Sequence, residues 1–145
     1  MVKYLLIMLF SLFLSRNTAL PDGPNIKFDK MIFDFGTIHE GDVKTCSFRF
    51  TNTGNAPLLI IDVEKPCGCT IPSWTKSPVM PGQSGQIDVI YNSKERPGVF
   101  RKTLSVKTNI AAFKDNPPIL MIKGNALTPK EVKALNKANK DNAKK

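Results

Sequence analysis

The chain has 145 residues, a formal net charge of +9, three cysteines and one histidine, and its length corresponds to one ordinary domain with additional segments. The sequence contains no Ser/His/Asp set, no glycine-rich phosphate loop and no paired-carboxylate pattern, which are signatures of hydrolases and nucleotide-binding enzymes. It therefore excludes these enzyme classes and predicts a protein that is not an enzyme and holds no cofactor.

Residues 1–19 have the pattern of a secretory signal peptide. Lys3 precedes an apolar run at 5–14 that only Ser11 interrupts, and small or polar residues lead up to Ala19. This pattern is typical of an exported protein whose signal is cleaved near Ala19. A membrane span needs roughly 20 apolar residues, so an uncleaved anchor is the second interpretation. We expect a periplasmic or extracellular protein, whose thiols meet oxidising conditions.

The positive charge is concentrated at the C-terminal end. Residues 128–145 contain six lysines and two acidic residues, and the signal segment holds two further basic residues, so residues 20–127 carry only +3. The tail has no aromatic residue on which a base could stack, and an exported protein rarely meets nucleic acid. We therefore expect no nucleic-acid partner and a tail that is solvated or faces an anionic surface.

The first patterned stretch is residues 26–35. Its alternation with period two predicts one strand, with a buried face that holds Phe28, Met31, Phe33 and Phe35. Gly36 interrupts this pattern, and residues 39–42 have the composition of a turn, in which Gly41 is suited to positive φ. His39, the only histidine, is interpreted as a surface residue of this turn.

Residues 45–51 form the clearest strand of the sequence. Its apolar face holds Cys46, Phe48 and Phe50. A tight turn at 52–55 leads to a second apolar strand at 57–63. Because this strand has large apolar residues on both faces, we predict that it is central in its sheet.

Three further strands follow in the second half of the chain. Pro81 and Gly82 predict a type II turn ahead of a strand at 87–91, and a second turn precedes a strand at 100–107. The last strand, 119–123, follows two prolines, which confine its start to a sheet edge or to a strand entry.

About seven short strands with frequent turns indicate an all-β fold, an immunoglobulin-like antiparallel β-sandwich over residues 20–127. A barrel is the structural alternative. The tail begins with a capping hydroxyl at Thr128, proline at the first helical position, and Glu131 three residues on. This pattern predicts a short basic helix from Pro129. The helix has few apolar positions, so we expect it to dock weakly and to fray towards its end.

Four short motifs occur in a characteristic order: Phe33-Asp34-Phe35-Gly36, Asn52-Thr53-Gly54-Asn55, Cys67-Gly68-Cys69-Thr70 and Pro81-Gly82. In this order, over roughly residues 31–125, the sequence resembles the bacterial family DUF1573, a domain of unknown function. The resemblance implies an exported immunoglobulin-like module, similar to the domains of motile sperm protein and of cilium-associated proteins. It implies no established activity.

The Cys67-Gly68-Cys69 segment is the most distinctive motif of the chain. At a bent loop the two sulfurs approach bonding distance, so a Cys67–Cys69 disulfide or tight turn is the first interpretation. Metal binding is the second, since two thiolates suit a soft cuprous ion whereas a closed zinc site needs two further donors. Thiol redox exchange is the third, although the spacing lacks the two-residue gap of thioredoxin-type motifs.

Two further residues bear on this loop. Cys46 is interpreted as a packed core thiol, and a bridge from Cys46 to either of the other cysteines is the alternative pairing. Trp74 is interpreted as a hydrophobic lid over the cysteine loop, with an exposed anchor in a partner interface as the alternative. The candidate functional loop comprises Cys67, Gly68, Cys69, Thr70 and Trp74.

The sequence thus favours an exported, non-catalytic module of the cell envelope that binds another envelope protein. The alternative is a small periplasmic carrier of cuprous ion or of thiol redox equivalents that uses the Cys-Gly-Cys motif. Membrane association is open through an uncleaved signal or through the basic tail, and the oligomeric state stays open.

Overall fold

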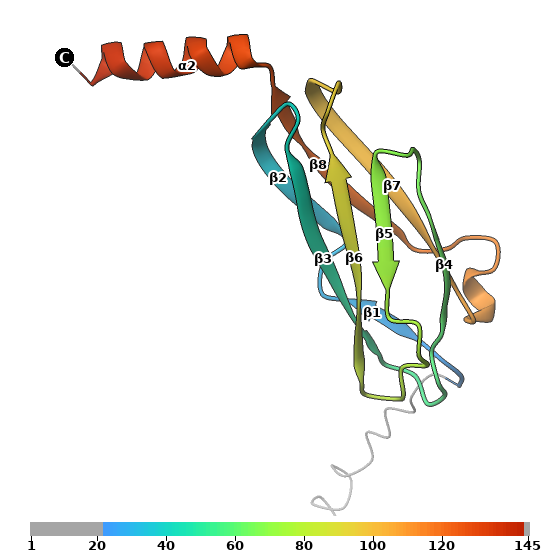
Figure 1. The fold of residues 1–145 in the computed structure, drawn as a ribbon. Coiled ribbons are helices and arrows are strands. Elements are labelled where there is room, and N and C mark those ends of the chain that lie inside the picture. The colour runs from blue at the N-terminus through green and yellow to red at the C-terminus, as the bar shows by residue number, and fades with distance from the viewer. Residues whose placement is uncertain (1–21, 144–145) are drawn as a thin grey trace, which may run out of the picture.

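The computed structural model describes residues 22–143, so the predicted signal segment 1–19 lies outside the described residues. Two four-stranded sheets pack face to face, and a C-terminal helix extends beyond one end of the sandwich (Figure 1). No helix in the described part of the chain is long and apolar enough to cross a membrane.

The first sheet is antiparallel throughout, in the order β1-β3-β6-β5. Its strands are β1 (Ile26–Phe28), β3 (Val43–Asn52), β6 (Ser84–Asn92) and β5 (Thr70–Trp74). The long pair β3–β6 holds Cys46 opposite Val89 and Phe48 opposite Ile87. Alternation along these strands places one side chain in two inside the sandwich.

The second sheet has the order β2-β8-β7-β4. Its strands are β2 (Ile32–His39), β8 (Ile119–Leu127), β7 (Gly98–Thr108) and β4 (Ile60–Glu64). A short 3-10 helix, η1 (Ala111–Phe113), lies between β7 and β8. β2 runs parallel to β8, while the other pairs are antiparallel. The immunoglobulin-like sandwich is therefore confirmed, with eight strands and one parallel pair.

The stretch predicted as a single strand at 26–35 is divided between the two sheets. The chain leaves β1 after Phe28 and enters β2 at Ile32, and Met31 between them is 41% exposed. Gly36 does not end the strand, because β2 continues through a bulge to His39. Phe33 and Phe35 pack against the core as expected. The prediction was wrong because one alternation pattern is shared by two strands that face the same core.

One further predicted strand position is wrong, and one alternative that the sequence left open is decided. β4 is an edge strand, not a central one, and Ile61 on its outer side is 58% exposed. β8 lies inside its sheet between β2 and β7 and extends to Leu127. The prolines before β8 precede the ladder and remove no hydrogen bond from it. Of the two expected roles of these prolines, strand entry is the one that the structure shows.

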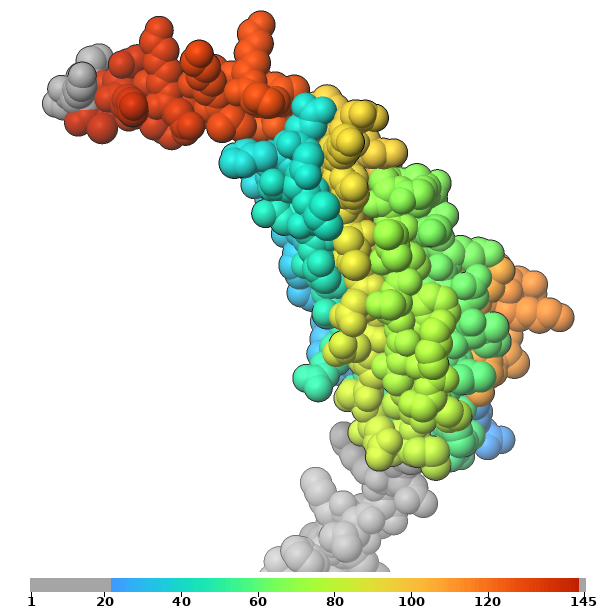
Figure 2. Space-filling view, viewed as in Figure 1, coloured from blue at the N-terminus to red at the C-terminus, as the bar shows by residue number. Residues whose placement is uncertain are grey.

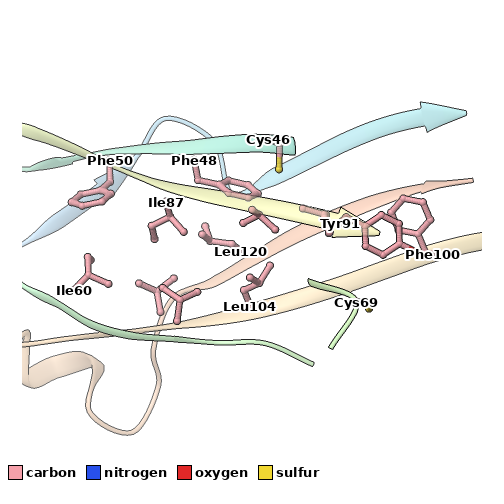
Figure 3. Close-up of a cluster of buried hydrophobic side chains, with 14 of the residues drawn as sticks. Cys46, Phe48, Phe50, Ile60, Cys69, Ile87, Tyr91, Phe100, Leu104 and Leu120 are labelled. Atoms are coloured by element: carbon pink, nitrogen blue, oxygen red, sulfur yellow. The ribbon is translucent and has the colours of Figure 1, made fainter. Parts of the chain in front are cut away.

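The core between the sheets is a continuous apolar cluster (Figure 3). Tyr91 lies inside it, and its ring stacks on Phe100 with the ring centroids 4.3 Å apart. The Tyr91 hydroxyl has no hydrogen-bond partner within residues 22–143. Burial of this group raises the pKa of Tyr91. A buried hydroxyl without a partner opposes folding, because it leaves its hydrogen bonds to water behind.

Replacing Tyr91 with phenylalanine is therefore expected to raise the free energy of unfolding by about 1–2 kcal/mol. The substitution keeps the stacked ring and removes the unpaired hydroxyl. Urea unfolding of both proteins measures the change, and Tyr91→Leu is the control, since it removes the stack and is expected to destabilise. A lower midpoint for Tyr91→Phe than for the parent chain would contradict the prediction.

The predicted tail helix is confirmed as α2 (Pro129–Asn142). Thr128 accepts a hydrogen bond from the backbone N–H of Glu131, whose side chain accepts from the backbone N–H of Thr128. Within Pro129–Asn142 only Val132 is partly buried. Weak docking is therefore also confirmed, since the helix is held by its cap and by contacts of its first turns alone.

Candidate functional site

The Cys67-Gly68-Cys69 turn connects the edge strands β4 and β5 and so crosses from the second sheet to the first. Asn92 at the end of β6 donates its backbone N–H to the carbonyl of Cys69 at 2.9 Å, and Thr70 donates to the carbonyl of Cys67 at 3.4 Å. The Cys69 end of the turn is thus fixed to β6, and the bond from Thr70 closes the turn on itself. Gly68 at the apex is exposed, with open space where a side chain would stand.

The Sγ atoms of Cys67 and Cys69 lie at bonding distance as a disulfide, and their Cα atoms are 5.3 Å apart. This contact agrees with the first interpretation of the motif. The two sulfurs differ in their surroundings, because Cys69 is 4% exposed while Cys67 is partly exposed. The buried Thr70 hydroxyl lies 3.8 Å from Cys67 Sγ and 3.6 Å from Cys69 Sγ. One polar group therefore contacts both sulfurs.

Trp74 lies at the far end of β5 from this turn. The strand register places Thr70 opposite Tyr91 and Trp74 opposite Ile87, a separation of about 13 Å along the strand. The indole Nε1 donates to the backbone carbonyl of Ile60 in β4 at 3.2 Å, and the Lys76 Nζ lies 3.1 Å from the ring centroid. Trp74 therefore joins the two edge strands and is not a lid over the cysteine loop.

The sequence did not predict β5 as a strand, because Pro72 occupies its middle. Backbone hydrogen bonds from Asn92 to Cys69 and from Thr75 to Gln86 bracket the strand. With this register, the backbone groups of residues 70, 72 and 74 point to the open edge. Pro72 has no N–H, so this edge lacks a donor at its centre, which disfavours pairing with another strand.

Three exposed apolar side chains lie near one another on the outer face of the same sheet, at the end that holds the cysteine turn. Ile71 lies opposite Ile90, which in turn lies opposite Thr45, and Val43 is two residues along from Thr45. Val43, Ile71 and Ile90 are 61%, 55% and 38% exposed. In the next row down the sheet, Ser47 donates to the carboxylate of Asp88. We call Val43, Ile71 and Ile90 the apolar row.

Cys46 is separate from the cysteine turn. It is 4% exposed in the core face of β3, where it was predicted to lie, and it forms no disulfide. Burial raises the pKa of the Cys46 thiol from 9.0 to about 11. The alternative bridge from Cys46 to Cys67 or Cys69 is therefore not formed in this structure, and a protonated core thiol has little nucleophilic character.

The buried Cys46 thiol predicts a loss of stability in alkali. The thiol ionises at a lower pH in the unfolded chain than in the folded chain. The contribution of Cys46 to the free energy of unfolding is therefore complete below pH 9 and is lost as the pH rises to about 11. The shift corresponds to at most about 2.7 kcal/mol. Cys46→Val is expected to remove this part of the pH dependence, as measured by urea unfolding between pH 8 and pH 11. Equal slopes for both chains would contradict the assignment.

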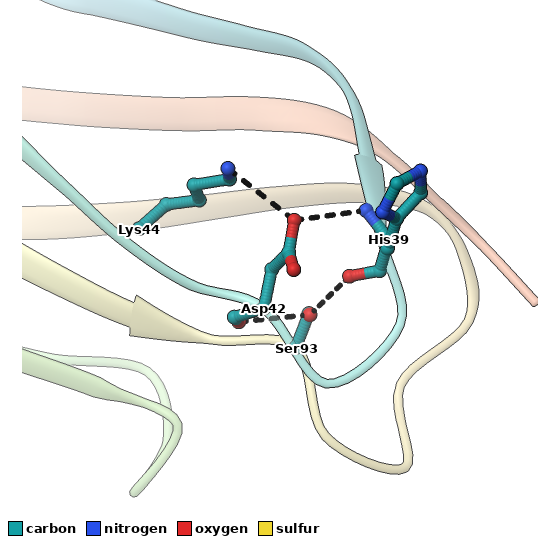
Figure 4. A network of polar contacts seen from close by, with 4 residues as sticks. All are labelled: His39, Asp42, Lys44 and Ser93. Atoms are coloured by element: carbon teal, nitrogen blue, oxygen red, sulfur yellow. Dashed lines mark hydrogen bonds and ion pairs between the residues drawn. The ribbon is translucent and has the colours of Figure 1, made fainter.

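His39 and its neighbours form a polar network at the β2–β3 turn (Figure 4). The Asp42 carboxylate accepts from the His39 backbone N–H at 3.1 Å and pairs with Lys44 Nζ at 3.3 Å. Its hydrogen bond from the His39 backbone lowers the pKa of Asp42. The Ser93 hydroxyl lies 2.9 Å from each of the His39 and Asp42 carbonyl oxygens. The network uses backbone atoms of His39, which agrees with its interpretation as a turn residue.

Metal ligands are sparse in this part of the molecule. Residues 22–143 contain no group of three or more His, Cys, Asp or Glu side chains arranged to hold an ion. Cys67 and Cys69 could act as two sulfur donors only when reduced, because a disulfide sulfur is not a thiolate.

Two packed sheets, a tight cysteine turn between their edges and a buried core together define an immunoglobulin-like domain. Residues 26–126 match the family described as protein of unknown function, DUF1573. The chain belongs to this family. No curated protein matches the chain.

Solved structures share the fold at low sequence identity. A protein of unknown function from Porphyromonas gingivalis W83 is 14% identical with a TM-score of 0.62, over 72% of this chain and 47% of that one. The VesB protease of Vibrio cholerae is 14% identical with a TM-score of 0.56, over 70% and 32%. The chain thus spans less than half of either protein.

A human domain matches over most of its own length. The ASH or PapD-like domain 7 of CEP192 is 8% identical with a TM-score of 0.56, over 71% of this chain and 85% of that domain. These likenesses show the fold alone.

Proposed function

We propose that this chain is an exported, non-catalytic module of the cell envelope that binds another protein through the outer face of β3, β6 and β5. The observation that carries the proposal is the apolar row of Val43, Ile71 and Ile90. Apolar side chains grouped on a surface gain free energy when a partner removes them from water. Export rests on the sequence pattern of residues 1–19.

The framework makes this surface suitable for binding. The three side chains belong to three hydrogen-bonded strands, so their spacing is set before a partner arrives, and little conformational entropy is lost on association. The Gly68 apex is exposed beside them and adds no bulk. Pro72 disfavours strand addition at the β5 edge, so the side-chain face and not the backbone edge is the proposed contact.

The test is site-specific photocrosslinking in the producing cell. A photoreactive residue at Ile71 is expected to give a discrete adduct with one envelope protein, and Ile90→Ser should weaken that adduct. The matched control is Val99, an apolar residue 79% exposed on the other sheet, which should give none. No adduct at Ile71, or equal adducts at both positions, would rule out this surface.

A second candidate function is thiol–disulfide exchange at Cys67. The unequal exposure of the two sulfurs favours it, because an incoming thiolate can reach the partly exposed Cys67 Sγ more easily than the buried Cys69 Sγ. Attack forms a bond between that thiol and Cys67 Sγ and breaks the Sγ–Sγ bond. The electron pair passes to Cys69 Sγ, which takes a proton. A second thiol then releases the mixed disulfide and leaves two reduced cysteines.

Intact-mass measurement after treatment with glutathione and a thiol-blocking reagent tests this candidate. Exchange predicts a glutathione adduct on Cys67 and two blocked thiols at full reduction, in a Cys46→Val background that removes the third thiol. If the reduced protein retains cuprous ion through purification, the result would favour a carrier of cuprous ion, the other form of this second candidate. A disulfide that glutathione leaves intact in the folded protein would exclude both forms and would leave the protein-binding proposal standing.

A further inference from the structure

We propose that α2 binds the surface of an anionic lipid bilayer through a stripe of four lysines, Lys130, Lys133, Lys137 and Lys140. At 100° per residue these four positions fall within an arc of about 80° on the helix surface. They span about 15 Å along the helix axis. Together with Ala134 and Asn136 they line one shallow hollow on α2. The lysine stripe is thus a continuous positive surface.

The lysine stripe keeps a net positive charge within the described chain, although Asp141 beside its C-terminal end lowers that charge by one. All four side chains are exposed, and none forms an ion pair within residues 22–143. Like charges three or four residues apart on one helix face destabilise the helix. The arrangement therefore costs helix stability, and an anionic surface opposite the stripe would offset that cost.

The position of α2 leaves the stripe accessible. The helix projects away from the sandwich as a separate arm (Figure 2). The cap at Thr128 and the partly buried Val132 hold its first turns, and every later residue to Asn142 is exposed. Lys133 also lines a hollow with His39 and Glu40 where the helix leaves the sandwich. Lys137 and Lys140 are exposed beyond this junction, so a lipid surface can reach the stripe without unfolding the domain.

The remaining faces of α2 indicate adsorption and not insertion. Its apolar side consists of Ala134, Leu135 and Ala138, with Leu135 51% exposed, and contains no aromatic residue. Helices that insert deeply into the bilayer interface carry a larger apolar face with aromatic residues. Lysine is a compact point charge without the bidentate geometry of arginine. A planar array of lipid phosphates fits this stripe better than one specific acidic group.

Vesicle cosedimentation of the full chain tests the proposal. Binding should rise with the fraction of phosphatidylglycerol in phosphatidylcholine vesicles and should fall as salt is added. Each lysine is expected to strengthen binding about fivefold, so replacing all four with glutamine should weaken it by on the order of a hundredfold or more. Pure phosphatidylcholine vesicles measure any binding that residues 1–21 contribute, which the lysine substitutions should leave unchanged.

Two control variants separate the stripe from net charge. The first removes four exposed lysines of the sandwich instead: Lys27→Gln, Lys65→Gln, Lys94→Gln and Lys114→Gln. The second keeps composition and charge but moves two lysines to another helix face: Lys133→Asn, Lys137→Asn, Asn139→Lys and Asn142→Lys. The first control should retain binding and the second should lose most of it, with helicity checked by circular dichroism.

The contrary results are equally definite. Equal binding by the second control and the parent chain would show that net charge alone is responsible, which overturns the stripe. Binding that does not depend on phosphatidylglycerol overturns the lipid assignment. Neither result bears on the apolar row, because Ile71 lies on the sandwich and its crosslinking is measured independently.

Discussion

Replacing Asn52 with alanine is expected to lower the free energy of unfolding by about 3–5 kcal/mol. Asn52 is fully buried at the end of β3. Its Nδ2 donates to the carbonyls of Ala56 and Val79, both at 2.8 Å, and its Oδ1 accepts from the backbone N–H of Gly54 at 3.0 Å. The side chain thus connects two loop segments, the turn that holds Gly54 and Ala56 and the segment that holds Val79, and alanine leaves the buried Gly54 N–H without a partner.

Urea unfolding measures this effect, and Asn55→Ala is the matched control in the same turn. The Asn55 side chain is exposed and accepts one hydrogen bond, from the Gly23 N–H at 2.6 Å. We expect its replacement to cost less than about 1 kcal/mol. If the two substitutions cost the same, the buried network at Asn52 does not hold the loops together.

Asn52→Asp sharpens the test through its pH dependence. The introduced carboxyl still accepts from Gly54, but when ionised it faces the carbonyl oxygens of Ala56 and Val79. Burial and these acceptors would raise the folded-state pKa of the carboxyl. Its relative stability is therefore highest in acid and falls as the pH rises through that folded-state pKa. A variant that is as stable relative to the parent chain at pH 7 as at pH 4 would contradict this geometry.

Trp74→Ala is expected to lower the free energy of unfolding by about 2–4 kcal/mol, and Trp74→Phe by about 1 kcal/mol. Both variants lose the hydrogen bond from the indole to the Ile60 carbonyl. Only alanine also removes the aromatic ring that packs against the core between the edges of the two sheets. The partial burial of Trp74 places the loss below that of a fully buried tryptophan.

The control for Trp74 is Ile71→Ala on the same strand. Ile71 points to the opposite face and is 55% exposed, so its replacement should change stability by less than about 0.5 kcal/mol. Urea unfolding of the three variants, and crosslinking to the partner from a photoreactive residue placed at Val43, then separate two roles. Trp74→Ala should act on stability and Ile71→Ala on binding. An unchanged midpoint for Trp74→Ala would identify it as an exposed anchor instead.

The four motifs on which the family resemblance was based serve different purposes in the fold. Some hold the chain together, and others lie at the surface. Asn52 and Gly54 of the second motif have a packing task, since a Cβ on Gly54 would fall against the Gly23 carbonyl and within 2.5 Å of the Asn25 nitrogen. Gly68 in the third motif meets nothing within 4 Å of where a Cβ would stand. Gly36 and Gly82 of the first and fourth motifs also have open space, but their φ angles of +64° and +76° give a backbone reason for glycine. Gly68 has neither reason, which supports looking for function beside the cysteine turn.

The sequence alone determined those features that depend on neighbouring residues. Alternation along residues 45–51 placed Cys46 in the core, and the capping box predicted a helix from Pro129, which the structure confirms. The two-residue spacing of Cys67 and Cys69 allowed the contact between them. Each follows from backbone periodicity or local hydrogen bonding, which act over a few residues.

Only the tertiary structure decided which strands became edges and which side chains meet across the sheets. Residues 26–35 divide between two sheets, β4 and β5 lie at open edges, and Trp74 bonds to Ile60. The apolar row likewise needs β3, β6 and β5 side by side. Strand pairing joins residues far apart in sequence, and its register is set by burial of one common face. That information is distributed over the chain and is absent from any single motif.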